Sequence, residues 1–191
     1  LEEDLVKTNL KKITNLISRD ISVFEQLACA SPHTIFIRTK NKKIILEFCA
    51  ELSKCLDRYL RIFPKIPSTS AQIQSILNLR TSYAINEKVW ASSGTEYSVF
   101  FDKEIKFGPN IGFRNVFCRT FLKIEDITKV IPKNVQTVGM LINKKNKSEY
   151  MDKLAASGVL RFKNIGSMTN FEIPWDGIDI PRNLVNYIPK I

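Results

Sequence analysis

Residues 26–37 read QLACASPHTIFI, and this stretch decides how the rest of the chain is interpreted. It places Cys29 between two alanines, which leave room for another molecule to approach the sulfur. Pro32 ends any helix that precedes it, and the β-branched and aromatic residues that follow predict a strand over 34–39. The core of that strand, residues 35–37, is apolar without alternation, which is typical of a parallel sheet covered on both faces. A thiol at such a junction is a candidate catalytic group, although free cysteines are also among the most buried residues of proteins.

Helical and strand patterns alternate along the rest of the chain. Apolar spacing predicts a helix over 1–18, and Ser22 with Glu25 fits a capping box for a second, short helix before Cys29. Further helices are expected over 42–63, 68–86, 126–130 and 147–157, and further strands over 97–101, 115–124, 135–142 and 159–162. In the helix over 68–86 the residues expected to face inward are Ile73, Ile76, Leu77 and Leu79, and Gly158 is placed to end the helix before it. This order predicts an α/β fold, a three-layer sandwich with a largely parallel sheet spanning residues 1–191.

Length and charge bound the function without choosing it. A chain of 191 residues suits one domain, and no apolar run approaches the ~18 residues of a membrane span. No signal peptide is visible, so we expect a cytoplasmic protein. The net charge of +10 favours anionic partners such as nucleic acid, acidic lipid or phosphorylated cofactors. The basic runs 40–43 and 144–147 are expected to be solvated loops beside helices.

The four cysteines and the single histidine do not form a metal site by spacing. Cys29, Cys49, Cys55 and Cys118 contain no Cys-x-x-Cys pair, whereas zinc sites built from cysteine and histidine need closer pairing. Apart from Cys29 they are expected to be core thiols of a reducing compartment. His33 could neighbour Cys29, but a lone histidine at the start of a strand is more often structural, and we assign it no catalytic role.

Several stretches together resemble one known family. Residues 26–32, QLACASP, resemble the nucleophile segment of the aldehyde dehydrogenase superfamily and, within it, the long-chain acyl-CoA reductases (LuxC family). These fatty acid reductases supply aldehyde to bacterial luciferase, which links the family to luminescence. The stretches QTVG (136–139), RFKNIG (161–166) and PWDG (174–177) resemble later segments of the same family. The resemblance spans nearly the whole chain.

The resemblance implies a reaction at Cys29. In this family the cysteine takes the acyl group of a fatty acyl-CoA or acyl-protein thioester, and hydride from NADPH then releases a long-chain aldehyde. It also implies possible acyl-protein synthetase and acyl transferase subunits as partners, and a homo-oligomer when full length. The chain then corresponds to the catalytic, cysteine-bearing domain, 1–191. About half of such a protein, with the NAD(P)-binding domain upstream, is expected to be missing, and no Gly-x-Gly-x-x-Gly occurs here. We therefore expect the isolated fragment to be inactive in full turnover.

Two departures from the superfamily pattern stand out. Gln26 lies three residues before Cys29, whereas the superfamily commonly has a glutamine two residues before its cysteine. The segment EIKFGP (104–109) resembles the Glu-x-Phe-Gly-Pro segment whose glutamate contacts the nicotinamide ribose, but it contains Lys106 as an insertion. Glu104 is accordingly a candidate cofactor contact, and a plain hairpin turn is the alternative explanation of the segment.

Three other functions stay open at this point. The chain could be an aldehyde dehydrogenase that oxidises aldehyde to acid, which needs a general-base glutamate outside this sequence. It could be a basic α/β module that binds nucleic acid, although the aromatic residues fall at core spacing and no basic helix face is evident. It could also be a scaffold that kept the fold and docks partner subunits.

Overall fold

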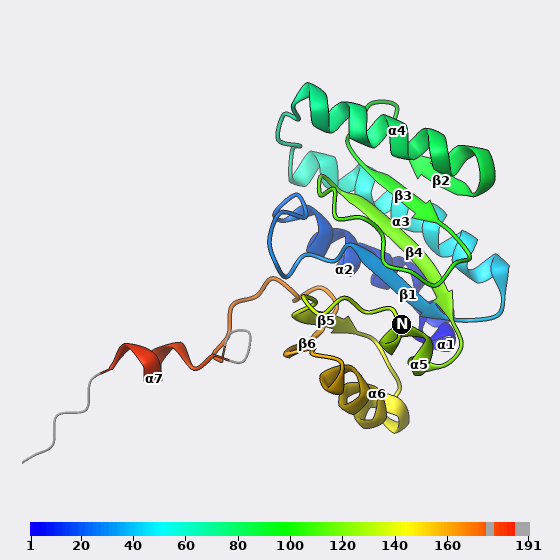
Figure 1. Ribbon diagram of the computed structural model, residues 1–191. Helices are drawn as coiled ribbons and strands as arrows, with labels where there is room; N and C mark the ends of the chain where they lie inside the picture. The colour runs from blue at the N-terminus through cyan, green and yellow to red at the C-terminus, as the bar shows by residue number, and fades with distance from the viewer. Residues whose placement is uncertain (175–177, 186–191) are drawn as a thin grey trace, which may run out of the picture.

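A computed structural model describes residues 1–174 and 178–185 as a mixed α/β fold with two sheets (Figure 1). The helices are α1 (Glu3–Thr8), α2 (Leu10–Ser22), α3 (Lys42–Ile62), α4 (Ser70–Asn86), α5 (Ile124–Thr128), α6 (Lys144–Ala156) and α7 (Ile180–Leu184). The strands are β1 (Thr34–Arg38), β2 (Lys88–Ala91), β3 (Ser98–Phe101), β4 (Asn115–Phe121), β5 (Thr137–Met140) and β6 (Arg161–Asn164). None of the described helices combines the length and apolar content needed to cross a bilayer.

The larger sheet has the order β1-β4-β3-β2. β1 and β3 both pair with β4 in parallel, and the edge strand β2 runs antiparallel to β3. β5 and β6 form a second, parallel pair, which lies with α5 and α6 below the main sheet in Figure 1. The predicted α/β fold with a largely parallel sheet is confirmed, and the antiparallel strand β2 was not predicted.

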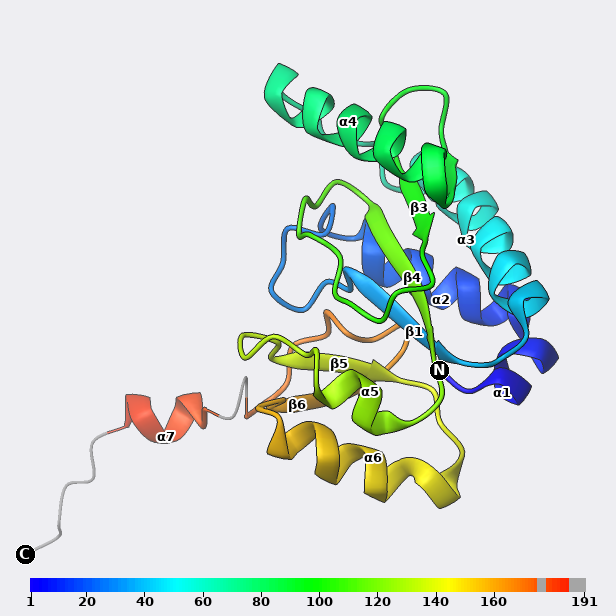
Figure 2. The ribbon, with the colours of Figure 1, turned by 45° about the vertical axis from the view of Figure 1, so that its right-hand side comes forward.

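Helices cover the two faces of the main sheet unequally. Alternate residues of the central strands, such as Val99 and Val116, pack with α1, α2 and α3 in one buried core. On the opposite face Phe100 and Phe117 stack with their ring centroids 4.9 Å apart, and Tyr83 of α4 lies against both rings. Figure 2 shows α4 beside β3 and away from β1, so the β1 end of this face is left to loops and to the second pair of strands. The described layers are therefore complete on one face and partial on the other.

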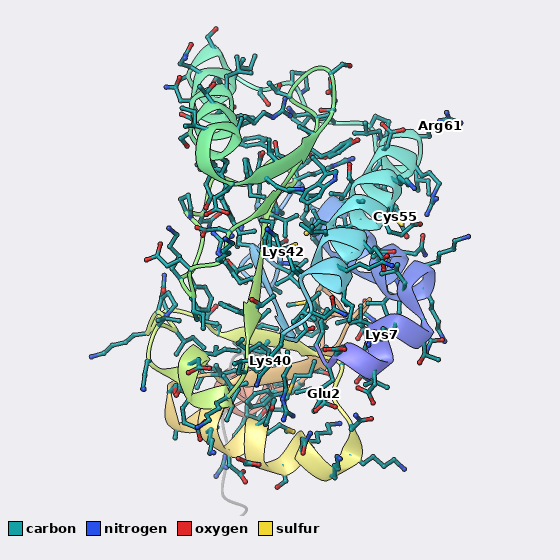
Figure 3. The ribbon with its side chains drawn as sticks, turned by 90° about the vertical axis from the view of Figure 1, so that its right-hand side faces the viewer. Glu2, Lys7, Lys40, Lys42, Cys55 and Arg61 are labelled. Atoms are coloured by element: carbon teal, nitrogen blue, oxygen red, sulfur yellow. The ribbon has the colours of Figure 1, made fainter. Side chains whose placement is uncertain are left out.

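The amino-terminal segment ties the two sheets together. Glu2 is buried, and its carboxylate accepts a hydrogen bond from the Asn143 N–H at the start of α6 (2.6 Å). The same carboxylate lies 3.4 Å from the guanidinium of Arg38 at the end of β1. Figure 3 shows Glu2 between α1 and α6. The position of the second strand pair relative to the first is thus fixed partly by one buried carboxylate.

Several local predictions were wrong for identifiable reasons. Over residues 70–85 of α4 only Ile76 is buried, while Ile73 and Leu77 are exposed, because Arg80 and Tyr83 make contacts that apolar spacing assigned to leucine and isoleucine. The basic run 144–147 begins α6 rather than forming a loop, whereas residues 40 and 41 of the other run lie in the loop before α3, which starts at Lys42 as predicted. Gly158 ends α6 with a φ of +102°, as expected for a glycine after a helix. The stretch 174–177 that resembles the family ending lies largely outside the described residues.

Candidate active site

Cys29 lies in the connection between α2 and β1 and is the exposed member of four free cysteines. Cys49, Cys55 and Cys118 are buried, as the sequence led us to expect. The thiol borders a cavity of about 790 Å³. Three segments far apart in sequence wall this cavity, namely 27–34, 107–112 and 134–140. The structure therefore gathers the cysteine stretch and the QTVG stretch, which are more than a hundred residues apart, around one space.

A tight turn presents the sulfur to the cavity. The Ser31 N–H donates to the Ala28 carbonyl (2.9 Å), so Cys29 and Ala30 are the central residues of the turn. The side-chain amide of Gln26 donates to the Pro32 carbonyl (2.8 Å) and so links the residues before and after the turn. Across residues 1–174 and 178–185, the N–H groups of Cys29 and Ala30 donate to no other protein group. Cys29 is exposed and borders the cavity, so its N–H is available to a bound molecule, whereas Ala30 is buried and does not border the cavity.

The chain before the turn differs from the predicted capping box. α2 continues to Ser22, no second helix follows, and the buried Ser22 hydroxyl has no partner within the described part of the chain. The carboxylate of Glu25 instead forms a buried ion pair with Arg114 at the start of β4. Burial raises the pKa of Glu25 above its ordinary value, and the nearby charge of Arg114 acts in the opposite direction. The capping box was wrong because this distant arginine competes for the same side chain.

His33 also borders the cavity, half-buried at the start of β1. Burial lowers the pKa of its imidazole, so the neutral form is favoured in the folded protein. Next to it, the Thr34 hydroxyl accepts a hydrogen bond from the Gly108 N–H (3.1 Å) and fixes the 107–112 wall against β1. The imidazole is thus a neutral group on the cavity wall.

Asp20 is a cavity residue that the sequence analysis missed as part of the site. It is buried near the end of α2, and its carboxylate accepts hydrogen bonds from the N–H groups of Gly166 and Met168. Burial raises the pKa of Asp20 despite these two donors. Its position three residues after Ile17, on the apolar face of α2, is the signal that could have revealed it. The contact fastens the turn after β6 to the helix that leads into the cysteine loop.

Met168 connects that turn to β5. A Cβ atom placed on Gly139 would lie 2.5 Å from the Met168 sulfur, so a larger residue at this point of the QTVG stretch would require the Met168 side chain to shift. Glycine here allows close packing and has no unusual backbone angle.

Glu104 lies apart from the residues that wall the cavity. Its side chain is exposed and pairs with Lys106, which also lies 3.1 Å from Asp102. The segment joins β3 to the parallel strand β4, so the alternative explanation as a hairpin turn was wrong. A role for Glu104 in cofactor binding stays a prediction. Among the described residues no group of three or more histidine, cysteine, aspartate or glutamate side chains is arranged to hold a metal ion.

Comparisons with known proteins agree on one family. The model of the family described as acyl-CoA reductase (LuxC) matches residues 4–187. A long-chain acyl-protein thioester reductase of Aliivibrio fischeri is 25% identical over 165 residues, which cover 82% of this chain and 32% of that protein. The chain thus spans about a third of the length of this relative, less than the half that we expected.

The fold agrees with a solved structure. An indole-3-acetaldehyde dehydrogenase crystallised with NAD+ superposes with a TM-score of 0.56 at 10% identity, covering 81% of this chain and 35% of the dehydrogenase. This likeness identifies an aldehyde dehydrogenase-like fold. Because the family model covers nearly the whole sequence, the chain belongs to the acyl-CoA reductase (LuxC) family.

Proposed function

We propose that this chain carries the acyl-accepting site of a long-chain fatty acyl thioester reductase, with Cys29 as its nucleophile. The observation that supports this most is the placement of the one exposed thiol on a tight turn beside a cavity walled by the family-like stretches. In the proposed step the Cys29 thiolate attacks the carbonyl carbon of a fatty acyl-CoA or acyl-protein. The bond from that carbon to the departing sulfur breaks, the departing thiolate takes up a proton, and the acyl group remains on Cys29.

The residues around Cys29 suit this step physically. Sulfur is a strong nucleophile, and the Cys29 thiol is exposed beside the cavity. The attack places negative charge on the carbonyl oxygen. The unpaired N–H of Cys29 is a donor of the kind that stabilises such an oxyanion. The small methyl side chain of Ala28, which borders the cavity, leaves room for the carbonyl to approach.

For the complete protein we propose reduction of the acyl group to a long-chain aldehyde with NADPH as hydride donor. The candidate cofactor contact, Glu104, is exposed, is paired with Lys106 and does not border the cavity. We therefore derive no step that runs through the cofactor. An NAD(P)-binding domain upstream of this catalytic domain remains part of the proposal.

The proposal extends to location and assembly on the resemblance alone. We propose a cytoplasmic, homo-oligomeric enzyme that could receive acyl groups from acyl-protein synthetase and acyl transferase subunits. The chain belongs to a reductase family, and the net charge, on which the nucleic-acid-binding alternative rested, does not by itself favour that alternative. The oxidation of aldehyde to acid is the rival reaction within the superfamily.

Assaying the full-length protein in both directions tests the proposal. We expect hexadecanoyl-CoA and NADPH to yield aldehyde and free CoA, and Cys29→Ala to abolish aldehyde formation. Cys55→Ser, at a buried thiol outside the cavity, is the matched control and should retain activity. Faster formation of acid from aldehyde than of aldehyde from thioester would favour the dehydrogenase, and aldehyde formation by Cys29→Ala would refute the role of Cys29.

A further inference from the structure

We propose that the buried ion pair between Glu25 and Arg114 is a positioning device that fixes the turn bearing Cys29. The inference deepens the proposed function and rests on it. Glu25 precedes Cys29 by four residues, and Arg114 immediately precedes β4, a central strand of the main sheet. Both side chains are almost completely withdrawn from solvent, at 3% and 0% exposure. They connect a surface loop to the rigid core.

Three segments of the chain converge on this pair. The Arg114 guanidinium binds the Glu25 carboxylate and donates to the Phe63 carbonyl just after α3. The backbone repeats the connection, because the Phe113 N–H donates to the Glu25 carbonyl (2.7 Å). The loop before Cys29 is thus held to β4 by a side-chain pair and a backbone bond at the same point. Movement of the loop would have to break both.

Backbone conformation marks the same place. Among the described residues, the non-glycine residues with positive φ are Glu25 (52°), Gln26 (60°), Phe113 (54°) and Arg114 (58°). Non-glycine residues rarely adopt this left-handed region of the backbone, and they remain in it only where the surrounding structure holds them there. Such outliers cluster at active sites. Here two strained dipeptides face each other across the ion pair, immediately before the proposed nucleophile.

Stability alone is a poor reason for this arrangement. A buried ion pair stabilises a fold no better than well-packed apolar residues of similar size. The second oxygen of Glu25 and two nitrogens of Arg114 have no hydrogen-bond partner in the described part of the chain. What the pair supplies is a fixed direction. It holds the sulfur and the N–H of Cys29 in one geometry beside the cavity. Misplacing a reacting group by ~1 Å can slow a reaction about 100-fold.

Two reactions of the same sulfur separate positioning from simple reactivity. Acylation by hexadecanoyl-CoA needs the sulfur and the oxyanion donor aligned, whereas iodoacetamide needs only an accessible thiolate. We expect Glu25→Gln and Arg114→Met to slow acylation of Cys29 by about tenfold or more. Alkylation, followed from pH 6 to 10, should keep its apparent pKa and stay within about threefold of wild type. Arg114→Lys keeps the charge without the planar fork and should recover part of the acylation rate.

The matched control uses another buried acid–arginine pair. Asp102 and Arg119 lie 3.7 Å apart, are buried and do not border the cavity. Asp102→Asn should leave both rates near those of wild type. The double variant Glu25→Gln/Arg114→Met should be no slower than the slower single variant, because the two residues act as one unit. Equal losses in acylation and alkylation, or acylation at the wild-type rate in Glu25→Gln, would overturn the inference.

Hydrogen exchange keeps this inference separate from the acyl chemistry. If wild-type Cys29 takes no acyl group, the proposed function fails. The positioning role of the Glu25–Arg114 ion pair is then tested by hydrogen exchange of the amides in residues 26–31. We then expect about tenfold faster exchange there in Glu25→Gln than in Asp102→Asn, with exchange in β4 residues 116–120 unchanged. Equal exchange in the two variants would refute the positioning role.

Discussion

A methyl group added at Gly108 would collide with a side chain that has no space to move aside. Its Cβ atom would lie 1.9 Å from Cδ2 and 2.1 Å from Cγ of the Phe117 ring. Carbon atoms in ordinary contact are ~3.5 Å apart, so the overlap is about 1.6 Å. Gly108 is held by its hydrogen bond to Thr34. Phe117 is fully buried, its ring stacks with that of Phe100, and the Arg119 guanidinium carbon lies 5.4 Å from its ring centroid.

The expected loss follows from these constraints. Overpacking of a core typically lowers the free energy of unfolding by ~1–3 kcal/mol. Because neither partner of this contact can yield, we expect Gly108→Ala to lie at the upper end, about 3 kcal/mol. With a typical dependence on denaturant, the urea midpoint should fall by about 1–2 M. Circular dichroism during urea titration measures it.

Two further variants test the cause. Phe117→Leu removes the ring, so adding it to Gly108→Ala should cost less than the sum of the two single changes. Gly94→Ala is the matched control, because its new Cβ would meet only the flexible carboxylate end of Glu96. A Gly108→Ala protein within about 0.5 kcal/mol of wild type would show that the 107–112 wall is not held against β4 as described.

Two other predictions concern residues around the cavity. Burial lowers the pKa of His33, so the unfolded chain binds more protons below pH ~6.5 and this share of stability is lost as pH falls through that window. The free energy of unfolding of His33→Gln should therefore fall less between pH 7.5 and 5 than that of wild type, and parallel curves would contradict this. Asp20→Ala leaves the N–H groups of Gly166 and Met168 without their acceptor, which should lower the free energy of unfolding by about 2 kcal/mol or more. An unchanged urea midpoint for Asp20→Ala would contradict the role of this carboxylate in joining α2 to the turn after β6.

The sequence predicted correctly those helices and strands whose bounds are set by neighbouring residues. β1 was predicted within a residue because Pro32 and a continuous β-branched run define it. α3 was predicted within a residue because its apolar stripe is long and Pro64 follows it. β2 escaped notice because KVWA is short and directly follows a helix, and it becomes a strand only by pairing with β3. The inward face of α4 was wrong because its contacts run through Arg80 and Tyr83.

The candidate site divides in the same way. Cys29 was predicted as a site residue from its small neighbours and from the family resemblance, and this stays a prediction. The partners that hold it could not be predicted, because Glu25 and Arg114 are 89 residues apart and Asp20 and Gly166 are 146 apart. The only sign of such a pair in the sequence is an acidic residue at a position where the helical pattern predicts an apolar one. Contacts of this kind are decided by the sheet order, which one sequence does not reveal.

Locating the acyl group tests the central claim most directly. The protein is mixed with hexadecanoyl-CoA, quenched, digested and analysed by mass spectrometry for acylated cysteine peptides. We expect one hexadecanoyl group on the peptide containing Cys29, its release by hydroxylamine, and its absence in Cys29→Ala. An acyl group on Cys49, Cys55 or Cys118, or equal labelling of Cys29→Ala, would contradict the account.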